Sequence, residues 1–407
     1  MLKRKKIAFC HIHKTAGTTL SNYLHSNYPR EEIFPVDRLD GLTQRLIDSI
    51  NDYWLIVGHF PLSFLRAFLS SEWKIITVLR DPEARFVSHL AFNHQLAHVG
   101  AEVVPPMDLS QLSGDIEAFS DFQTKTLGAW LSRDEWRYLV ATRKVHVHHK
   151  TTEWLRGGSA AALRIASEEL ARIDAVLWDQ SLDGGLRRVA IDYGLWPVDE
   201  LPVTNRGDYR GVQSDAARLV LHQIAAEQNL QDLSLCELAR QHLVEPPTDA
   251  EWAAYHARWM GQYEPARSFV LAADHLWMGT GWVGPNFTAD GNGFFWSVTT
   301  LAQFLYLPIT TAGAYEMELA LYLPKRKDGF LISMRLDGRL IEPISVQFPD
   351  DRVYVKFQFE REVKDVNRMT LVEFVSDCST QIREPGGIPN AGFVMSAAIG
   401  RLLRPGA

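Results

Sequence analysis

Short apolar runs alternate with segments of helical periodicity over the first two-thirds of the chain. An apolar run followed by a helical pattern indicates a crossover unit, and repeated units predict a parallel sheet with helices on both faces. We therefore expect an α/β domain built on a parallel sheet. The apolar runs are "KIAFCHI" (6–12), "DYWLIVGHF" (52–60), "WKIITVLR" (73–80) and "ARIDAVLWDQ" (171–180), and the helical patterns include "TTLSNYLHSNY" (18–28) and "PEARFVSHLAFNHQLA" (82–97).

The period of the pattern changes to two after residue 265. In "AYEMELALYLP" (314–324), apolar side chains alternate with Glu316, Glu318 and Ala320, and "VYVKFQFER" (353–361) alternates likewise. Such alternation is typical of half-buried strands, and Asp337-Gly338 between two such runs is a hairpin signal. The sequence predicts a catalytic-type domain over 1–243, a linker over 244–264 and an all-β sandwich over 265–407.

Composition narrows the class of protein. A length of 407 residues favours two domains, and a net charge of -7 argues against a general nucleic-acid coat. The three cysteines, Cys10, Cys236 and Cys378, are too few and too scattered for a disulfide framework. The apolar stretch after "MLKRKK" is broken at once by His11, and no stretch approaches the roughly 20 apolar residues of a membrane span. We expect a cytoplasmic protein without a membrane span or a nucleic-acid partner.

The segment "HKTAGTT" (13–19) lies between the first strand and the helix that we expect to begin near Thr18. Backbone amides of such a loop and of the helix start converge on an anion, and Lys14 adds a positive charge. The chain has no Gly-Lys pair, so this is not the triphosphate loop of P-loop kinases. An isolated threonine-rich turn would only cap a helix, but a lysine at the strand end favours an anion site.

A second strand-to-helix segment supports this interpretation. In "WKIITVLRDPEARFVSHLAF", Arg80 ends the strand, Asp81 can cap the next helix, and Pro82 suits its first position. Ser88 lies eight positions after Arg80, about two turns into the helix. The two side chains are therefore expected to reach one phosphate together.

Together these segments resemble the sulfotransferases that use 3′-phosphoadenosine 5′-phosphosulfate (PAPS), especially those acting on carbohydrates. "HIHKTAGTTL" is similar to their 5′-phosphosulfate loop and "VLRDPEARFVSHL" to their 3′-phosphate element, with weaker echoes such as "DFQTKTLGAW" (121–130), over roughly residues 5–243. The resemblance implies a P-loop-like sulfotransferase fold with helices on both faces of the sheet, PAPS as co-substrate and no metal requirement. It assigns the 5′-phosphosulfate to Lys14, Thr15, Ala16, Gly17, Thr18 and Thr19, the 3′-phosphate to Arg80 and Ser88, and a nucleotide contact to Asn205. Ala16 stands where many relatives have glycine.

The resemblance also points to a catalytic base. Carbohydrate sulfotransferases of similar pattern often place a histidine in a "GH" segment after the second strand, which is His59 here. A neutral imidazole can accept the proton of an acceptor hydroxyl, while Lys14 would stabilise the departing phosphate oxygen. A histidine that merely hydrogen-bonds at a strand end is the alternative.

Other clusters have a simpler interpretation. His11, His13 and "HVHH" (146–149) lack the carboxylate or cysteine spacing of a metal site. The aromatic residues around 282–296 are expected in a β core, although the layout loosely resembles accessory β-sandwich domains of bacterial glycan-modifying enzymes. The acceptor is expected to be a glycan hydroxyl, with a lipid, a small metabolite or a tyrosine left open. The alternatives to a PAPS-dependent sulfotransferase are a nucleotide-dependent kinase and a glycan-binding protein with an inactive sulfotransferase-like domain.

Overall fold

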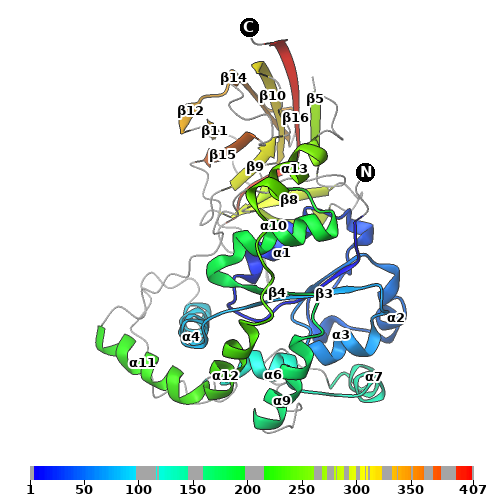
Figure 1. Ribbon diagram of the computed structural model, residues 1–407. Coiled ribbons are helices and arrows are strands. Elements are labelled where there is room, and N and C mark those ends of the chain that lie inside the picture. The colour runs from blue at the N-terminus through cyan, green and yellow to red at the C-terminus, as the bar shows by residue number, and fades with distance from the viewer. Residues whose placement is uncertain are drawn as a thin grey trace.

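A parallel four-stranded sheet forms the centre of the first part of the chain (Figure 1). The computed structural model describes residues 4–97, 116, 119–144, 159–197 and 215–260, and strand segments between 268 and 405. The sheet has the order β2-β1-β3-β4, and every neighbouring pair is parallel. Its strands are β1 (Ile7–Cys10), β2 (Leu55–Gly58), β3 (Lys74–Leu79) and β4 (Ala175–Trp178).

Successive residues of each strand point to opposite sides of this sheet, so that both faces are apolar. Helices cover both faces. Phe9 packs into one hydrophobic cluster, whereas its neighbours Ala8 and Cys10 pack into another. The Phe9 side is covered by α1 (Gly17–His25), α10 (Leu182–Tyr193) and α13 (Asp249–Met260). The opposite side is covered by α2 (Gln44–Asp48), α3 (Leu62–Phe68), α4 (Pro82–Ala97), α6 (Phe122–Gly128), α7 (Arg133–Ala141), α9 (Ser159–Leu170), α11 (Asp215–Gln228) and α12 (Leu230–Ala239).

The C-terminal part consists of two antiparallel sheets whose buried side chains belong to one cluster. The first has seven strands in the order β13-β14-β10-β16-β8-β7, with β5 also paired to β16. The second has five, in the order β12-β11-β15-β9-β6. The strands of the first sheet are β13 (Ser345–Gln347), β14 (Arg352–Arg361), β10 (Gly313–Tyr322), β16 (Ala391–Pro405), β8 (Gly293–Val298), β7 (Trp282–Phe287) and β5 (Ser268–Ala272); those of the second are β12 (Arg339–Ile341), β11 (Ile332–Leu336), β15 (Thr370–Ser376), β9 (Gln303–Leu307) and β6 (Gly279–Thr280).

The predicted change from α/β to all-β structure is confirmed at this level. The alternation in β10 is real: Tyr315, Met317, Leu319 and Leu321 are buried. β11 pairs with β12 in an antiparallel register that matches Leu336 with Arg339, which is the hairpin expected around Asp337-Gly338. The side chains of Trp282, Phe294, Phe295 and Trp296, expected in the β core, lie outside the described residues.

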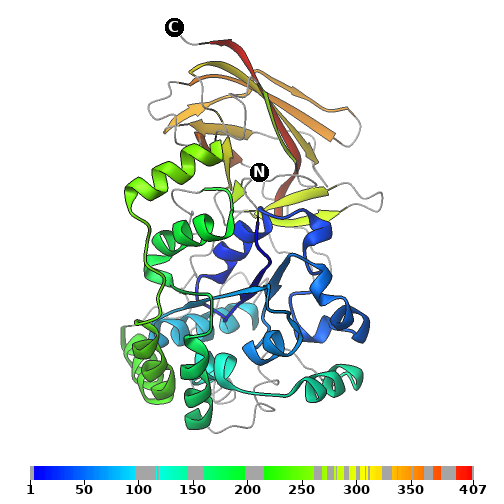
Figure 2. The same ribbon diagram turned by 45° about the vertical axis from the view of Figure 1, so that its right-hand side comes forward.

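The segment predicted as a linker, 244–264, contains the helix α13. This helix lies with α1 and α10 between the parallel sheet and the antiparallel sheets in both views (Figures 1 and 2). Its aromatic side chains Trp252, Tyr255 and Trp259 are buried. An apolar face of this kind needs a packing partner, so this part of the segment is a packed element.

None of the helices within the described residues combines the length and the apolar character needed to cross a membrane.

Candidate functional site

The predicted site residues follow the carboxyl ends of neighbouring parallel strands. The loop with Lys14 follows β1, His59 directly follows β2, and Arg80 directly follows β3. Parallel strands end at the same edge of a sheet, which is where open α/β sheets bind ligands. The order β2-β1-β3 therefore places the loop between the histidine and the arginine.

The loop after β1 adopts an unusual backbone conformation. Lys14 and Ala16 have φ angles of 66° and 61°, in the left-handed region that side chains other than glycine seldom adopt. Ala16 is also the residue that precedes α1, so the helix begins at Gly17, one residue before the predicted start. Strain of this kind is concentrated at functional sites, where the surrounding structure maintains it.

Gly17 is required by close contact with the ring of His11. A Cβ atom at this position would lie 1.9 Å from Nε2 of His11. The ring is held in turn by stacking on Phe9, with centroids 5.1 Å apart, and on His59, at 4.2 Å. The first turn of α1 can thus approach the strand end only because residue 17 has no side chain.

The Lys14 ammonium group lies against helix α4. Its Nζ is 4.4 Å from the centroid of the Phe92 ring, an arrangement in which the ring face attracts the cation. Burial, with the nearby charge of Arg80, lowers the pKa of Lys14 to about 8. A lysine in this state is mostly charged at neutral pH and gains from an anionic partner.

The hydroxyl groups assigned to the phosphosulfate differ in their surroundings. Thr15 is fully buried and donates a hydrogen bond of 2.9 Å to the carbonyl of Ile12, so its side chain closes the loop on itself. Thr19 is buried in the first turn of α1, and the side chain of Thr18 lies outside the described residues. The backbone amides at the start of α1 remain the groups best suited to an anion.

Arg80 links the loop to the end of β4. One guanidinium nitrogen donates to the carbonyl oxygen of Lys14 at 3.1 Å, and Nε lies 3.1 Å from a carboxylate oxygen of Asp179. The helix that follows has the predicted start: Pro82 is its first residue, and the Asp81 carboxylate accepts a hydrogen bond from the Ala84 N–H. Ser88 is buried two turns into this helix.

His59 has a defined tautomer. Its Nδ1 lies 2.8 Å from the carbonyl oxygen of His11, and a carbonyl only accepts, so Nδ1 carries the proton. The backbone N–H of His59 is held by the carbonyl of Asp37 at 2.8 Å. Burial lowers the pKa of His59 to about 4, below the value of an unperturbed imidazole. The neutral ring therefore has its lone pair on Nε2.

A further histidine stacks on this ring, and another contacts that histidine in turn. His13 stacks on His59 with centroids 3.6 Å apart and planes at 9°, and His89 of α4 meets His13 edge-on at 5.7 Å. Parallel stacking presents ring faces, not nitrogen lone pairs, to the neighbour. Among the described residues, no group of three or more histidine, cysteine, aspartate or glutamate side chains is arranged to hold a metal ion.

Some predicted features lie outside the described residues: Asn205, assigned to the nucleotide, and the cluster "HVHH" at 146–149.

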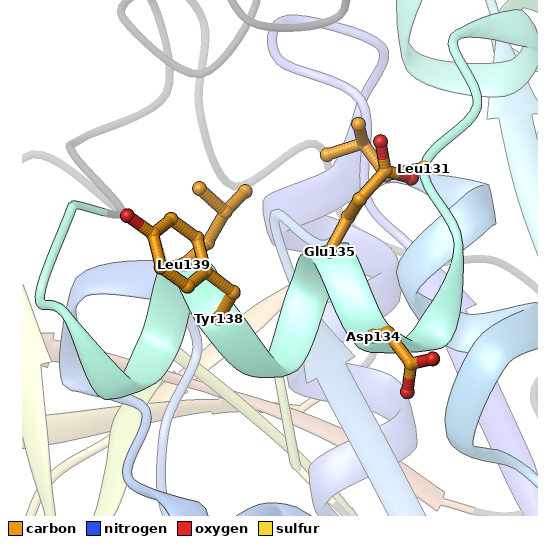
Figure 3. A pocket seen from close by; sticks show the side chains of 5 residues that line it. All are labelled: Leu131, Asp134, Glu135, Tyr138 and Leu139. Carbon is orange, nitrogen blue, oxygen red and sulfur yellow. The ribbon is translucent and has the colours of Figure 1, made fainter.

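A separate pocket lies on helix α7. It is lined by Leu131, Asp134, Glu135, Tyr138 and Leu139 (Figure 3). Glu135 accepts hydrogen bonds from the N–H and hydroxyl of Ser132 and so caps the helix. None of the predicted site residues lines this pocket.

Sequence reasoning missed two residues at the site. Asp179 pairs with Arg80, and its position directly after a predicted strand could have indicated it. Gln123 forms hydrogen bonds with both the backbone N–H and the carbonyl of Arg80, at 3.0 Å each. Its only signal in the sequence is its place in "DFQTKTLGAW".

Comparison with solved structures finds distant likenesses. The C-terminal CBM6 of LamC from Zobellia galactanivorans is 10% identical, with 33% of this chain and 98% of that chain covered and a TM-score of 0.23. CBM35 from Cellvibrio japonicus Abf62 is 12% identical, with 34% and 99% covered and a TM-score of 0.22. Scores this low carry no argument about function.

Comparison with protein families gives a clearer result. No curated protein matches the chain. Residues 1–118 match the Sulfotransferase family, and this segment contains the loop after β1, His59 and the β3–α4 element. The N-terminal part of the chain therefore belongs to the sulfotransferase family.

Proposed function

We propose that this sulfotransferase takes the sulfuryl group from PAPS and transfers it to a hydroxyl group of a carbohydrate. The observation that carries the proposal is the convergence of Lys14, His59 and Arg80 at one edge of the parallel sheet. Arg80 contacts the loop of Lys14 directly. A nucleotide with charged groups at both ends needs cations on both strand-to-helix elements.

The donor would be held by the two strand-to-helix elements. The amides of the loop and of α1, together with Lys14, suit the phosphosulfate, because a helix N-terminus and a cation both favour an anion. Arg80 suits the 3′-phosphate through charge-assisted hydrogen bonds, with Ser88 as a second donor. A positive charge and left-handed residues in a loop are features of backbone concavities that bind anions, and this loop has both.

The chemistry would use His59 as the base. Its Nε2 accepts the proton of the acceptor hydroxyl, and the oxygen attacks sulfur in line. The bond between sulfur and the bridging phosphate oxygen breaks, and Lys14 stabilises the charge left on that oxygen. The products are a sulfate ester and adenosine 3′,5′-bisphosphate (PAP).

We propose a carbohydrate acceptor because of the sequence of two motifs. The "GH" segment with His59 and the loop sequence resemble those of carbohydrate sulfotransferases. A lipid, a small metabolite or a tyrosine would present the same hydroxyl chemistry, so acceptor screening must include these classes.

Calorimetric titration of the full chain with PAP and with Mg·ATP tests the donor. We expect binding of PAP and weak or no binding of ATP. Tight binding of ATP with weak binding of PAP would instead indicate a kinase. PAP binding without transfer of labelled sulfate to any acceptor class would indicate a binding protein.

Transfer of labelled sulfate to an acceptor, measured beside the calorimetric titration, tests the base. A positioned general base contributes about 10²–10⁴-fold to the rate, so His59→Ala should lose turnover by about that factor while PAP affinity stays nearly constant. His222→Ala is the control, because His222 is exposed on α11 and pairs with Glu83. Near-normal turnover by His59→Ala would remove His59 from the mechanism.

A further inference from the structure

Gln123, on helix α6, holds the backbone of Arg80 at two points. Its side-chain oxygen accepts a hydrogen bond from the Arg80 N–H, and its side-chain nitrogen donates to the Arg80 carbonyl, both at 3.0 Å. Gln123 is fully buried. The Cys236 thiol, 3.5 Å away, also donates to that carbonyl. The backbone of the residue that directly follows β3 is thus paired with a buried side chain.

The position of Gln123 is itself fixed by a buried carboxylate. Asp232 on α12 accepts hydrogen bonds from the backbone N–H groups of Gln123 and Thr124, at 3.2 and 2.7 Å, and so caps α6. Asp121, before α6, accepts in return from the N–H groups at the start of α12. The helix that presents Gln123 is therefore held at its first turn by hydrogen bonds to α12.

The same carboxylate reaches the element that follows Arg80. Arg85 on α4 and Asp232 are both completely buried, with Nε and a carboxylate oxygen 3.8 Å apart. Arg85 also donates to the Phe119 carbonyl at 2.7 Å. Both sides of Arg80, the strand end and the following helix, are thus tied to one buried network.

We infer that Gln123 is a positioning residue for recognition of the 3′-phosphate, acting through Arg80. The inference rests on the proposed function. The guanidinium group contacts both the Lys14 carbonyl and Asp179 from the backbone position that Gln123 holds. Gln123 fixes that position from the buried side, where it cannot touch a ligand itself. Loss of its two hydrogen bonds should therefore weaken binding of the 3′-phosphate and leave binding of the 5′-phosphate unaffected.

The test compares PAP with adenosine 5′-monophosphate, which lacks the 3′-phosphate. Gln123→Met keeps the length of the side chain and removes both hydrogen bonds. We expect about tenfold weaker PAP binding, the equivalent of one hydrogen bond to a charged group, and less than about twofold change for the monophosphate. Thr126→Val is the matched control: it also removes one buried hydrogen bond from α6, to the Phe122 carbonyl, but has no link to Arg80.

A double-mutant cycle with Arg80→Ala tests whether the effect passes through Arg80. In the Arg80→Ala protein, Gln123→Met should change PAP affinity by less than about twofold. Equal weakening of both nucleotides by Gln123→Met, or the same loss of PAP affinity with and without Arg80, would overturn the inference. A purely structural role would produce those results.

A second variant covers the case in which Gln123→Met does not fold. Gln123→Asn keeps the amide but shortens the side chain by one methylene. It should lower PAP affinity while leaving affinity for the monophosphate nearly unchanged. An unchanged preference for PAP over the monophosphate in a folded Gln123→Asn protein would contradict the inference. Equal affinity of the wild-type protein for the two nucleotides would overturn the proposed function itself, and this inference with it.

Discussion

At the scale of single residues, the loop after β1 combines strain and close packing. Lys14 and Ala16 occupy left-handed backbone conformations, while Gly17 fits against the ring of His11. The requirement for glycine therefore falls on residue 17 for reasons of space, whereas residue 16 has the conformation that glycine would prefer.

This difference predicts opposite effects for two neighbouring substitutions. The left-handed conformation of Ala16 costs about 1–2 kcal/mol, and Ala16→Gly removes this strain. The greater freedom of glycine in the unfolded chain offsets part of that gain. The melting temperature should therefore stay equal or rise. Gly17→Ala must displace His11, whose carbonyl holds His59. A displacement of about 1 Å at a reactive group can cost on the order of 100-fold in rate. Turnover and thermal melting of the two variants check this; a fully active Gly17→Ala protein would contradict it.

The pKa of Lys14 predicts how donor binding depends on pH. Since burial lowers this pKa to about 8, the free protein keeps the charge below pH 8 and loses it as the pH rises further. PAP affinity should be constant from pH 6.5 to 7.5 and weaker by up to about tenfold at pH 9, where only about a tenth of Lys14 is charged. Calorimetry across this range measures the effect.

The uncharged variant Lys14→Met is the control for this pH dependence. It should bind PAP weakly at every pH, with a flat profile above pH 7. An equal decline in both proteins would assign the titration to another group.

The sequence predicted where these residues lie but not what they touch. Lys14, His59 and Arg80 each follow an apolar run, so their meeting at one sheet edge follows from parallel topology alone. The stacking of His13 on His59 and the lowered pKa values depend on burial and on neighbours far along the chain. No periodicity carries that information.

At the scale of elements, a buried charge pair joins helices α4 and α12, and its carboxylate also accepts hydrogen bonds from α6. Arg85 and Asp232 have no exposed surface, and burial lowers the pKa of Arg85, an effect that Asp232 opposes. Removing one partner of such a pair leaves the other charge uncompensated, which is more costly than the pair itself is favourable.

Asp232→Asn should therefore destabilise the protein by about 3–5 kcal/mol, because Arg85 stays charged and the new amide places a donor near the N–H groups of Gln123 and Thr124. Thermal melting followed by circular dichroism measures this. Glu168→Gln is the control: it breaks the exposed pair with Arg164 on α9, and pairs of this kind contribute little. Equal melting of both variants would show that the buried pair is dispensable.

This network could not be predicted from the sequence. The strands and α4 were recognisable because they have apolar periodicity or clear caps. The short helix α6 is buried almost throughout, and its first turn is capped by residues more than a hundred positions away. A cap supplied by a distant side chain leaves no local signal.

At the scale of the whole molecule, the two parts share a hydrophobic cluster. It contains Leu20 and Tyr23 of α1, on the parallel sheet, and also Tyr315 and Phe357 of the antiparallel sheets. Helix α1 packs against β6 and β7. The helix that begins at the end of the Lys14 loop is thus covered by the C-terminal part, although no predicted site residue lies in that part.

We propose that the catalytic part ends after α13, and not at residue 243 as the sequence indicated. The Tyr255 hydroxyl of α13 donates to the carbonyl of Leu195, which follows α10. Arg187 of α10 lies over the Trp252 ring at 5.5 Å. These contacts tie α13 to the helices of the parallel sheet, and a chain that ends before it would lose them.

Two shortened proteins test this boundary. Residues 1–260 retain α13 and its buried aromatic side chains, whereas residues 1–243 expose the surface of α10 that α13 covers. Burial of one large aromatic side chain contributes about 1.5–3 kcal/mol, so the longer protein should melt several degrees higher. Both should melt below the full chain, because each uncovers α1, and the folded longer protein should still bind PAP. Equal melting of the two shortened proteins would contradict the boundary after α13. Failure of a well-folded 1–260 protein to bind PAP would show that the antiparallel sheets contribute directly to the donor site.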